Sequence, residues 1–284
     1  MGPVSPALPR VWVDGQLVDP HAPSVSAVDH AVTVGDAVFE TVKVQDGMPF
    51  ALTRHHRRLL RSAAGLGLPE PDLDMIRTGI EAVLDGPALD FGRLRYSVTG
   101  GLGPLGSDRG GAPLTYIVLA GPQPRPPSSG RVTVVPWVRN ERSAVAGLKT
   151  TSYAENVVAL ARAHERGAVE AVFANTRGEL CEGTGSNIFV VLGGQVLTPP
   201  ATSGLLPGIT RELVLEWAGE GGIRAWEETL PLRILEEADE VFLTSSTKDV
   251  LPVSAVDDRE LLPGPVTAAL AELFRRNAAR DIDP

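Results

Sequence analysis

The sequence is poor in cysteine and histidine, and it has no long apolar run. Cys181 is the single cysteine among 284 residues, which excludes an internal disulfide and a zinc site built on cysteine pairs. The five histidines form no HExxH pair, so no metal site is expected. No stretch reaches about 18 consecutive apolar residues, and residues 1–10 lack the charged-then-apolar order of a secretory signal. We therefore expect a cytoplasmic protein with no membrane partner.

Positive charge is scarce as well. Lysine and arginine number 26 against 35 aspartates and glutamates, so the net charge is -9, and no basic tract is present. A nucleic-acid partner is not expected, because phosphate binding needs clustered positive charge. Hydrophobic residues make up 43% of a chain longer than a single core usually requires, which favours two globular domains.

A proline- and serine-rich segment, GPQPRPPSSG at 121–130, divides the chain. It cannot pair in a sheet and is predicted to be a linker. The predicted domains are a small N-terminal α+β domain at 1–120 and a larger C-terminal domain at 131–284. In the first, residues 38–44 alternate as a strand, with Phe39, Thr41 and Lys43 on one face, and Thr53 is the predicted cap of the helix that follows.

Lysine is the rarest charged residue, with only Lys43, Lys149 and Lys248. A reaction that needs an amine nucleophile therefore has few candidates. Lys149 directly precedes a predicted helix that starts at Ser152, because Ser152 and Glu155 have the spacing of a capping box. Short, stiff backbone would hold this lysine for a Schiff base, and the alternative is an ordinary surface lysine.

Four features together match the needs of pyridoxal phosphate. Lys149 supplies the amine for its aldehyde, and Glu182, in CEGTGSN, supplies an acid for its ring nitrogen. Arg58 supplies a cation for its phosphate. Further phosphate donors are expected from a helix start at 208–210, with Thr210 as its cap, and from a hydroxyl cluster after a strand: Thr244, Ser245, Ser246 and Thr247. Taken singly, each feature also fits a solvated side chain or a turn.

Two other features are less specific. The glycine-rich loop at 100–111 is not followed by Gly-Lys-Ser/Thr, so it is not a Walker loop, and it is either an active-site flap or an ordinary surface loop. Cys181 has no histidine neighbour in sequence to activate it, and it is interpreted as buried packing.

Seven segments occur in the order found in a known family: WVDG, DHAVTVGDAVFET, HHRRL, GLKTTSYAENV, EGTGSNIFVV, LPGITR and ADEVFLTSSTKDVLPV. The chain resembles the class IV aminotransferases nearly end to end. This is the fold type IV pyridoxal-phosphate family of branched-chain and D-amino-acid transaminases and of 4-amino-4-deoxychorismate lyase. The resemblance implies a two-domain α+β or α/β fold, with a small α+β domain and a larger domain containing a β barrel. It also implies bound pyridoxal 5'-phosphate between the domains, a small-molecule amine substrate and a homodimer.

The resemblance also implies roles for individual residues. Lys149 would be the Schiff-base lysine and proton carrier, and Glu182 the partner of the pyridine nitrogen. The implied phosphate ligands are Arg58, Ile209, Thr210 and Ser246. Arg95 matches a substrate-contacting arginine of branched-chain enzymes, with Arg109 or Arg139 as alternatives. Thr41 and Tyr153 either line the pocket or have a core or cap role.

The GDAVFET segment and the run KTTSYAENVVALARAHERGA most resemble bacterial lyases of this family. The sequence therefore predicts a 4-amino-4-deoxychorismate lyase, which releases pyruvate and 4-aminobenzoate for folate precursor synthesis. Lyases of this type often carry Asn-Arg where this chain has Ser152-Tyr153, and an arginine where it has Leu105. The Arg-x-His trap of D-amino-acid transaminases is missing at 105–107. The alternatives are an amino-acid transaminase of the same class and a non-catalytic scaffold, which would need neither Lys149 nor Glu182.

Overall fold

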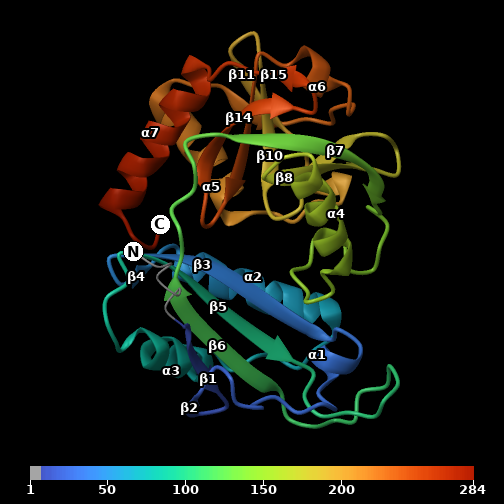
Figure 1. Cartoon of the computed structure of the whole chain (residues 1–284), viewed down its shortest axis with the longest axis vertical. Coiled ribbons are helices and arrows are strands. Elements are labelled where there is room, and N and C mark those ends of the chain that lie inside the picture. Colours follow the sequence, from blue (N-terminus) through green and yellow to red (C-terminus); the bar gives the residue numbers. More distant parts are fainter. Residues whose placement is uncertain (1–7) are drawn as a thin grey trace. The chain divides into compact units, whose positions relative to one another are not determined.

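The structure is a computed structural model that describes residues 8–284, so most of the segment examined for a secretory signal lies outside the described residues. The chain divides into two compact units (Figure 1). Unit 1 takes the chain up to Arg125, together with Leu148–Ser152 and Ile282–Pro284. Unit 2 consists of Pro126–Gly147 and Tyr153–Asp281. The lysine segment, which the sequence placed in the C-terminal domain, thus packs with unit 1.

Unit 1 is built on a six-stranded antiparallel sheet with the order β2-β1-β6-β5-β3-β4. Two helices, α2 (Leu52–Leu66) and α3 (Leu73–Leu84), pack on this sheet, and a short helix, α1 (His30–Thr33), precedes β3 (Figure 1). The strands are β1 (Arg10–Val13), β2 (Gln16–Val18), β3 (Ala37–Gln45), β4 (Met48–Pro49), β5 (Phe91–Thr99) and β6 (Thr115–Pro122).

Alternation along β3 decides which face of this sheet is covered. Val38, Val42 and Val44 are fully buried and join the core formed with residues of α2 and α3. Glu40 lies on the same face and is also fully buried. Phe39 and Thr41 point to the opposite face, as strand periodicity requires.

The start of α2 differs from the prediction. Thr53 is not the cap, because the helix begins at Leu52 after Ala51, which adopts a left-handed conformation with φ 56. The carboxylate of Asp283 accepts hydrogen bonds from the Thr53 N–H at 2.8 Å and the Thr53 hydroxyl at 2.5 Å. A residue 230 positions away thus satisfies donors that the helix start leaves open.

Unit 2 is built on a nine-stranded mixed sheet that curls into a half barrel. Its order is β12-β11-β10-β13-β14-β7-β8-β9, with β15 paired to β14, and the pairs β7–β8, β7–β14 and β11–β12 are parallel. The strands are β7 (Gly130–Arg139), β8 (Glu170–Asn175), β9 (Leu180–Gly183), β10 (Asn187–Leu192), β11 (Gln195–Thr198), β12 (Ala225–Glu227), β13 (Glu240–Ser245), β14 (Asp249–Val256) and β15 (Arg259–Glu260).

The helices of unit 2 are α4 (Ala154–Glu165), α5 (Ile209–Ala218), α6 (Ile234–Glu237), α7 (Pro265–Arg280) and the 3-10 turns η1 (Ala201–Ser203) and η2 (Gly219–Gly221). Helix α4 packs on β7 and β8, whereas α7 packs on α5 and β14. Within residues 8–284, no helix is long and apolar enough to cross a membrane, and no group of three or more histidine, cysteine or acidic side chains is arranged to hold a metal ion.

Candidate functional site

Backbone contacts with β3 and α2 hold the Lys149 segment. The Phe39 N–H donates to the Lys149 carbonyl at 3.0 Å, and the Thr151 N–H donates to the Ala37 carbonyl at 2.9 Å. On the other side, the Lys149 N–H donates to the Ser62 hydroxyl of α2 at 3.2 Å. The lysine backbone is therefore fixed on both sides within unit 1.

The predicted capping box does not form. Helix α4 begins at Ala154, with Tyr153 as its N-cap residue and no side-chain cap. The Ser152 hydroxyl donates instead to the Gly35 carbonyl at 3.4 Å, and the Glu155 carboxylate accepts from Arg139 at 2.5 Å. Tertiary contacts thus outcompete the local pattern at this helix start.

The three lysines have different surroundings. The Lys149 side chain is half-buried, with its Nζ 4.4 Å from the centre of the Phe39 ring. Lys43 is buried on β3 with its Nζ 4.8 Å from the centre of the Phe50 ring, and Lys248 pairs with Glu170. The Lys149 ammonium therefore lies beside the Phe39 ring of β3.

A second cation lies over the same aromatic ring. The Arg95 guanidinium carbon is 3.7 Å from the centre of the Phe39 ring. Arg95 on β5 is also directly opposite Thr41 on β3, so these side chains share one face of the sheet. Lys149, Arg95, Phe39 and Thr41 therefore form one cluster, which we call the Phe39 cluster.

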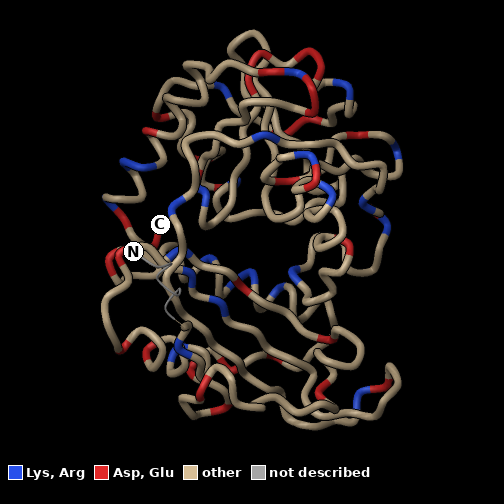
Figure 2. Tube along the Cα trace, viewed as in Figure 1, with Lys and Arg blue, Asp and Glu red and all other residues tan. Residues whose placement is uncertain are grey.

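Arg58 belongs to a buried charged group on the other face of β3. Its Nε and Nη2 donate to the two oxygens of Glu40 at 2.8 and 2.6 Å, and Arg58 is 5% exposed. The His55 Nδ1 is 2.7 Å from a Glu40 oxygen. Since an ionised carboxylate only accepts, this nitrogen is the donor. Figure 2 shows that basic residues recur along α2, the helix that carries Arg58.

Burial by itself would raise the pKa of the Glu40 carboxyl. The charge and hydrogen bonds of Arg58, together with the His55 hydrogen bond, outweigh burial and hold this pKa well below its usual range. Burial lowers the pKa of His55, which favours its neutral ring. Sequence reasoning missed this role of Glu40, although a glutamate among three valines on one strand face was a signal for it.

Glu182, on β9, is fixed within unit 2. Its Oε2 accepts the Leu206 N–H at 3.0 Å, and its Oε1 is 3.2 Å from the Arg139 Nε. The Arg139 guanidinium carbon also lies 4.1 Å from the centre of the Phe173 ring. Phe173 on β8 is the residue paired with Glu182 on β9. Arg139, one of the alternatives for binding substrate, is therefore an ion-pair partner of Glu182.

The predicted phosphate donors include the start of α5. Gly208, not Thr210, is the N-cap residue, and no side chain caps the helix. Ile209 and Thr210 lie in the first turn and are each 4% exposed. An added Cβ at Gly208 would collide with the Asn187 Oδ1, so a larger residue here would require the Asn187 side chain to move. First-turn N–H groups suit an anion, because the helix dipole and the donors act together.

The predicted hydroxyl donors follow β13. Ser245 is the last residue of β13 and Ser246 lies in the turn that leads to β14, and both are half-buried. The neighbouring Thr244 Oγ1 is buried and, within the described part of the chain, has no hydrogen-bond partner. A buried hydroxyl of this kind favours a polar ligand nearby. The donor set of unit 2 therefore fits a phosphate-bearing cofactor.

Arg109, in the glycine-rich loop, donates its hydrogen bonds to other residues of unit 1. Its Nε and Nη2 donate to the two oxygens of Asp36 at 2.6 Å each, and the Nη2 also donates to the Leu66 carbonyl at 2.9 Å. Hydrogen bonding from Arg109 lowers the pKa of Asp36. These contacts tie the loop at 100–111 to the end of α2, so Arg109 has a structural role in this arrangement.

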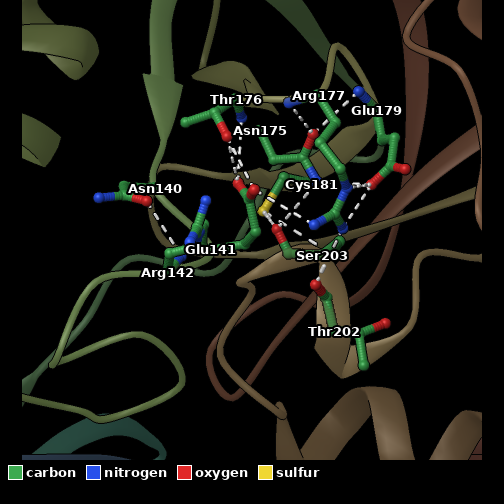
Figure 3. Close-up of polar contacts among 10 residues, drawn as sticks. All are labelled: Asn140, Glu141, Arg142, Asn175, Thr176, Arg177, Glu179, Cys181, Thr202 and Ser203. Carbon is green, nitrogen blue, oxygen red and sulfur yellow. Dashed lines mark hydrogen bonds and ion pairs between the residues drawn. The ribbon is translucent and has the colours of Figure 1, made fainter.

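A polar cluster anchors the loop that leads towards the lysine segment (Figure 3). The Glu141 carboxylate accepts from the Thr176 N–H at 3.1 Å, from the Thr176 hydroxyl at 2.7 Å and from Arg177 at 3.2 Å. Nearby, Cys181 is buried with its sulfur 3.4 Å from the Ser203 carbonyl oxygen. Burial raises the pKa of the Cys181 thiol to about 12, so this cysteine is inert packing.

Comparison with known proteins defines the family. Residues 37–256 match the family model described as amino-transferase class IV, and the chain belongs to this family. Members of the class are enzymes that use pyridoxal phosphate, and their fold is the fold type IV arrangement. This membership favours the enzymatic prediction over the scaffold alternative.

Individual relatives cover nearly the whole chain. A Methanocaldococcus jannaschii protein, provisionally named a branched-chain-amino-acid aminotransferase, is 34% identical, and the match covers 94% of this chain and 95% of that protein. A bifunctional aminodeoxychorismate lyase / D-amino acid transaminase of Mycobacterium tuberculosis is 30% identical, over 93% of this chain and 96% of that protein. The crystal structure of a branched-chain aminotransferase from Thermoproteus uzoniensis, with norvaline, has a TM-score of 0.87 and 31% identity, covering 94% and 93% of the two chains.

Proposed function

We propose that this chain uses Lys149 and pyridoxal phosphate to act on a small amine that carries a carboxylate. The Phe39 cluster is the observation that supports this proposal. It places the Lys149 Nζ 4.4 Å and the Arg95 guanidinium 3.7 Å from the centre of one ring. An amine next to a carboxylate would meet a proton-accepting amine and a guanidinium, and a guanidinium matches carboxylate geometry.

The roles of the cofactor ligands are part of this proposal. When bound, pyridoxal phosphate supplies an electron sink for the carbon next to the amine. The Lys149 Nζ holds the cofactor and later removes the proton from that carbon. Glu182, whose Oε2 is fixed by the Leu206 N–H, keeps a proton on the ring nitrogen. Phosphate would be bound by Arg58, Ile209, Thr210, Ser245 and Ser246.

Glu40 orients Arg58, the cation that is proposed to bind the phosphate. It uses the Nε and Nη2 of Arg58, so the plane of the guanidinium is fixed. Thr41 and Tyr153 are proposed to contact the substrate, and Thr41 shares its sheet face with Arg95.

We further propose 4-amino-4-deoxychorismate lyase activity as the specific reaction. Its support is the likeness of the 149–168 segment to bacterial lyases and the bifunctional relative in Mycobacterium tuberculosis. The proposed products are pyruvate and 4-aminobenzoate. Transamination of an amino acid is the second candidate, because both branched-chain relatives match almost the full length of this chain. The homodimer stays a prediction.

One assay separates the two reactions. Purified full-length protein is incubated with pyridoxal phosphate and 4-amino-4-deoxychorismate, without a keto acid, and pyruvate and 4-aminobenzoate are measured. We expect both products in equal amounts, and we expect neither from a Lys149→Met variant. If these products are missing, while a branched-chain amino acid and 2-oxoglutarate give glutamate, the reaction is transamination and the lyase proposal is wrong.

A second measurement addresses the lysine itself. Borohydride reduction of the holoenzyme should fix the cofactor mass on the peptide that contains Lys149. Lys43 and Lys248 are internal controls, since one is buried on β3 and the other pairs with Glu170. Cofactor mass on either of those peptides would contradict the assignment.

A further inference from the structure

A buried carboxylate in unit 2 accepts hydrogen bonds from the turn that follows Glu182. Glu170, at the start of β8, is 2% exposed. Its Oε1 accepts the Ser186 hydroxyl at 2.6 Å. Its Oε2 accepts the Gly185 N–H at 3.2 Å and the Thr184 hydroxyl at 3.3 Å. One side chain therefore fixes three successive residues of the turn.

Gly183 allows this close approach. An added Cβ at this position would lie 2.4 Å from the Glu170 Oε2 and 3.2 Å from the Ser186 carbonyl oxygen. The Gly183 N–H also donates to that carbonyl at 2.8 Å, which closes the turn. The backbone next to Glu182 is thus packed directly against the Glu170 carboxylate.

Lys248 connects the same carboxylate to a second turn. Its ammonium donates to the Glu170 Oε1 and lies 3.4 Å from the Ser186 hydroxyl oxygen. The Lys248 N–H donates to the Ser245 carbonyl at 3.2 Å, so this lysine closes the turn that carries Ser245 and Ser246. The Glu170 side chain is 3% exposed and that of Lys248 is 23% exposed, so water screens the pair only in part.

We propose that Glu170 and Lys248 are a positioning pair that sets the affinity of unit 2 for the cofactor's phosphate. The pair holds the turn at 183–186 and the turn at 245–248 together, and acts through them. This inference rests on the proposed function, which assigns Glu182 and Ser246 to the cofactor. Because Glu170 neutralises the Lys248 charge, the contribution of the lysine is geometry and not an additional cation.

The test compares two ligands that differ only in the phosphate. Dissociation constants of pyridoxal phosphate and of pyridoxal are measured by absorbance titration of the full-length apoprotein. The ratio of the two constants reports the phosphate contribution alone. We expect Lys248→Met to reduce this ratio about tenfold, which is the lower end of the loss in affinity when a residue that supports metal ligands is removed. Affinity for pyridoxal should stay within about twofold of wild type.

Three further variants make the test specific. Glu170→Gln should reduce the ratio by a similar factor, and the double variant should lose no more than either single one, because the two side chains act as a unit. Lys248→Arg keeps the charge and should restore most of the ratio. Arg131→Met is the control, because it breaks an ion pair with Glu260 in the same unit whose two side chains are both exposed. This variant should leave the ratio unchanged.

Each outcome decides the question. The inference is overturned if folded Lys248→Met and Glu170→Gln proteins keep the wild-type ratio, or if their effects add in the double variant. A fall in stability with an unchanged ratio would show a merely structural pair and would also overturn it. If wild-type protein binds neither ligand, the proposed function itself fails, and that result is recognisable without any variant.

Discussion

Replacing Glu40 by glutamine should destabilise unit 1 strongly. Glu40 is fully buried and accepts two hydrogen bonds from Arg58 and one from His55. The amide would turn an NH2 group towards these donors and remove the negative charge that faces the Arg58 guanidinium in the core. Removing one partner of a buried ion pair costs 3–5 kcal/mol, and since the amide keeps one acceptor, we expect about 3 kcal/mol.

Hydrogen exchange localises this effect to unit 1. Peptides from β3 and α2 should open about a hundredfold more often in the Glu40→Gln variant, because each 1.4 kcal/mol corresponds to a factor of about ten. Asp90→Asn is the matched control, since it makes the same change of carboxylate to amide in an exposed pair with Arg125. That change should cost less than about 1 kcal/mol. Equal exchange in the two variants would refute the reasoning.

The same variant also tests the pH dependence. The Glu40 pKa is held below its ordinary value of 4.5 in the folded protein. The ionised carboxylate therefore contributes stability that is fully present above pH 4.5 and is lost as the pH falls towards the folded pKa. Wild-type peptides of β3 and α2 should lose protection on acidification below that value. In Glu40→Gln, this part of the loss should be missing.

Three further predictions concern other contacts. Asp283→Ala removes the carboxylate that caps α2 through Thr53 and should lower the free energy of unfolding by about 1 kcal/mol, read from urea denaturation; an unchanged urea midpoint would contradict the cap. Hydrogen bonding from Arg109 lowers the pKa of Asp36 below its ordinary 3.8, so this contact stabilises the loop at 100–111 above that pH. Cleavage of the loop by pepsin should therefore increase as the pH falls below 3.8. In an Arg109→Gln variant the loop should be cleaved readily at either pH, so its cleavage should not increase on acidification. Because the Cys181 thiol has its pKa raised to about 12, a thiol reagent at pH 8 should modify folded protein on the order of a thousandfold more slowly than a small thiol, and rapid labelling would contradict its burial.

Strand periodicity predicted much of the fold around the candidate site. The alternation along β3 correctly separated Phe39 and Thr41 from Val38 and Glu40, because side chains on a strand point to alternate faces whatever surrounds them. The sequence did not show which face would be covered, since this depends on where α2 packs. The pairing of Glu40 with a helix residue 18 positions later was hidden for the same reason.

Local capping patterns were less reliable. Ser152 and Glu155 have capping-box spacing, yet each side chain bonds outside its own helix, to Gly35 and to Arg139. A capping box is worth about 1 kcal/mol, which is no more than a typical tertiary hydrogen bond. The sequence therefore cannot show whether a capping box or a tertiary hydrogen bond of similar energy will form, because the tertiary partners are not known from it.

The two units are interleaved along the chain, with consequences for folding and for dissection. Translation produces the six strands of unit 1 first, but Leu148–Ser152 and Ile282–Pro284 are synthesised much later. A fragment ending at Arg125 would therefore emerge from the ribosome without the strand neighbour of β3 that carries Lys149, and with the start of α2 uncapped. Unit 1 is complete only when nearly all of unit 2 has been made, so dividing the chain near residue 125 would split unit 1 between two fragments, whereas residues 126–284 would still contain all of unit 2.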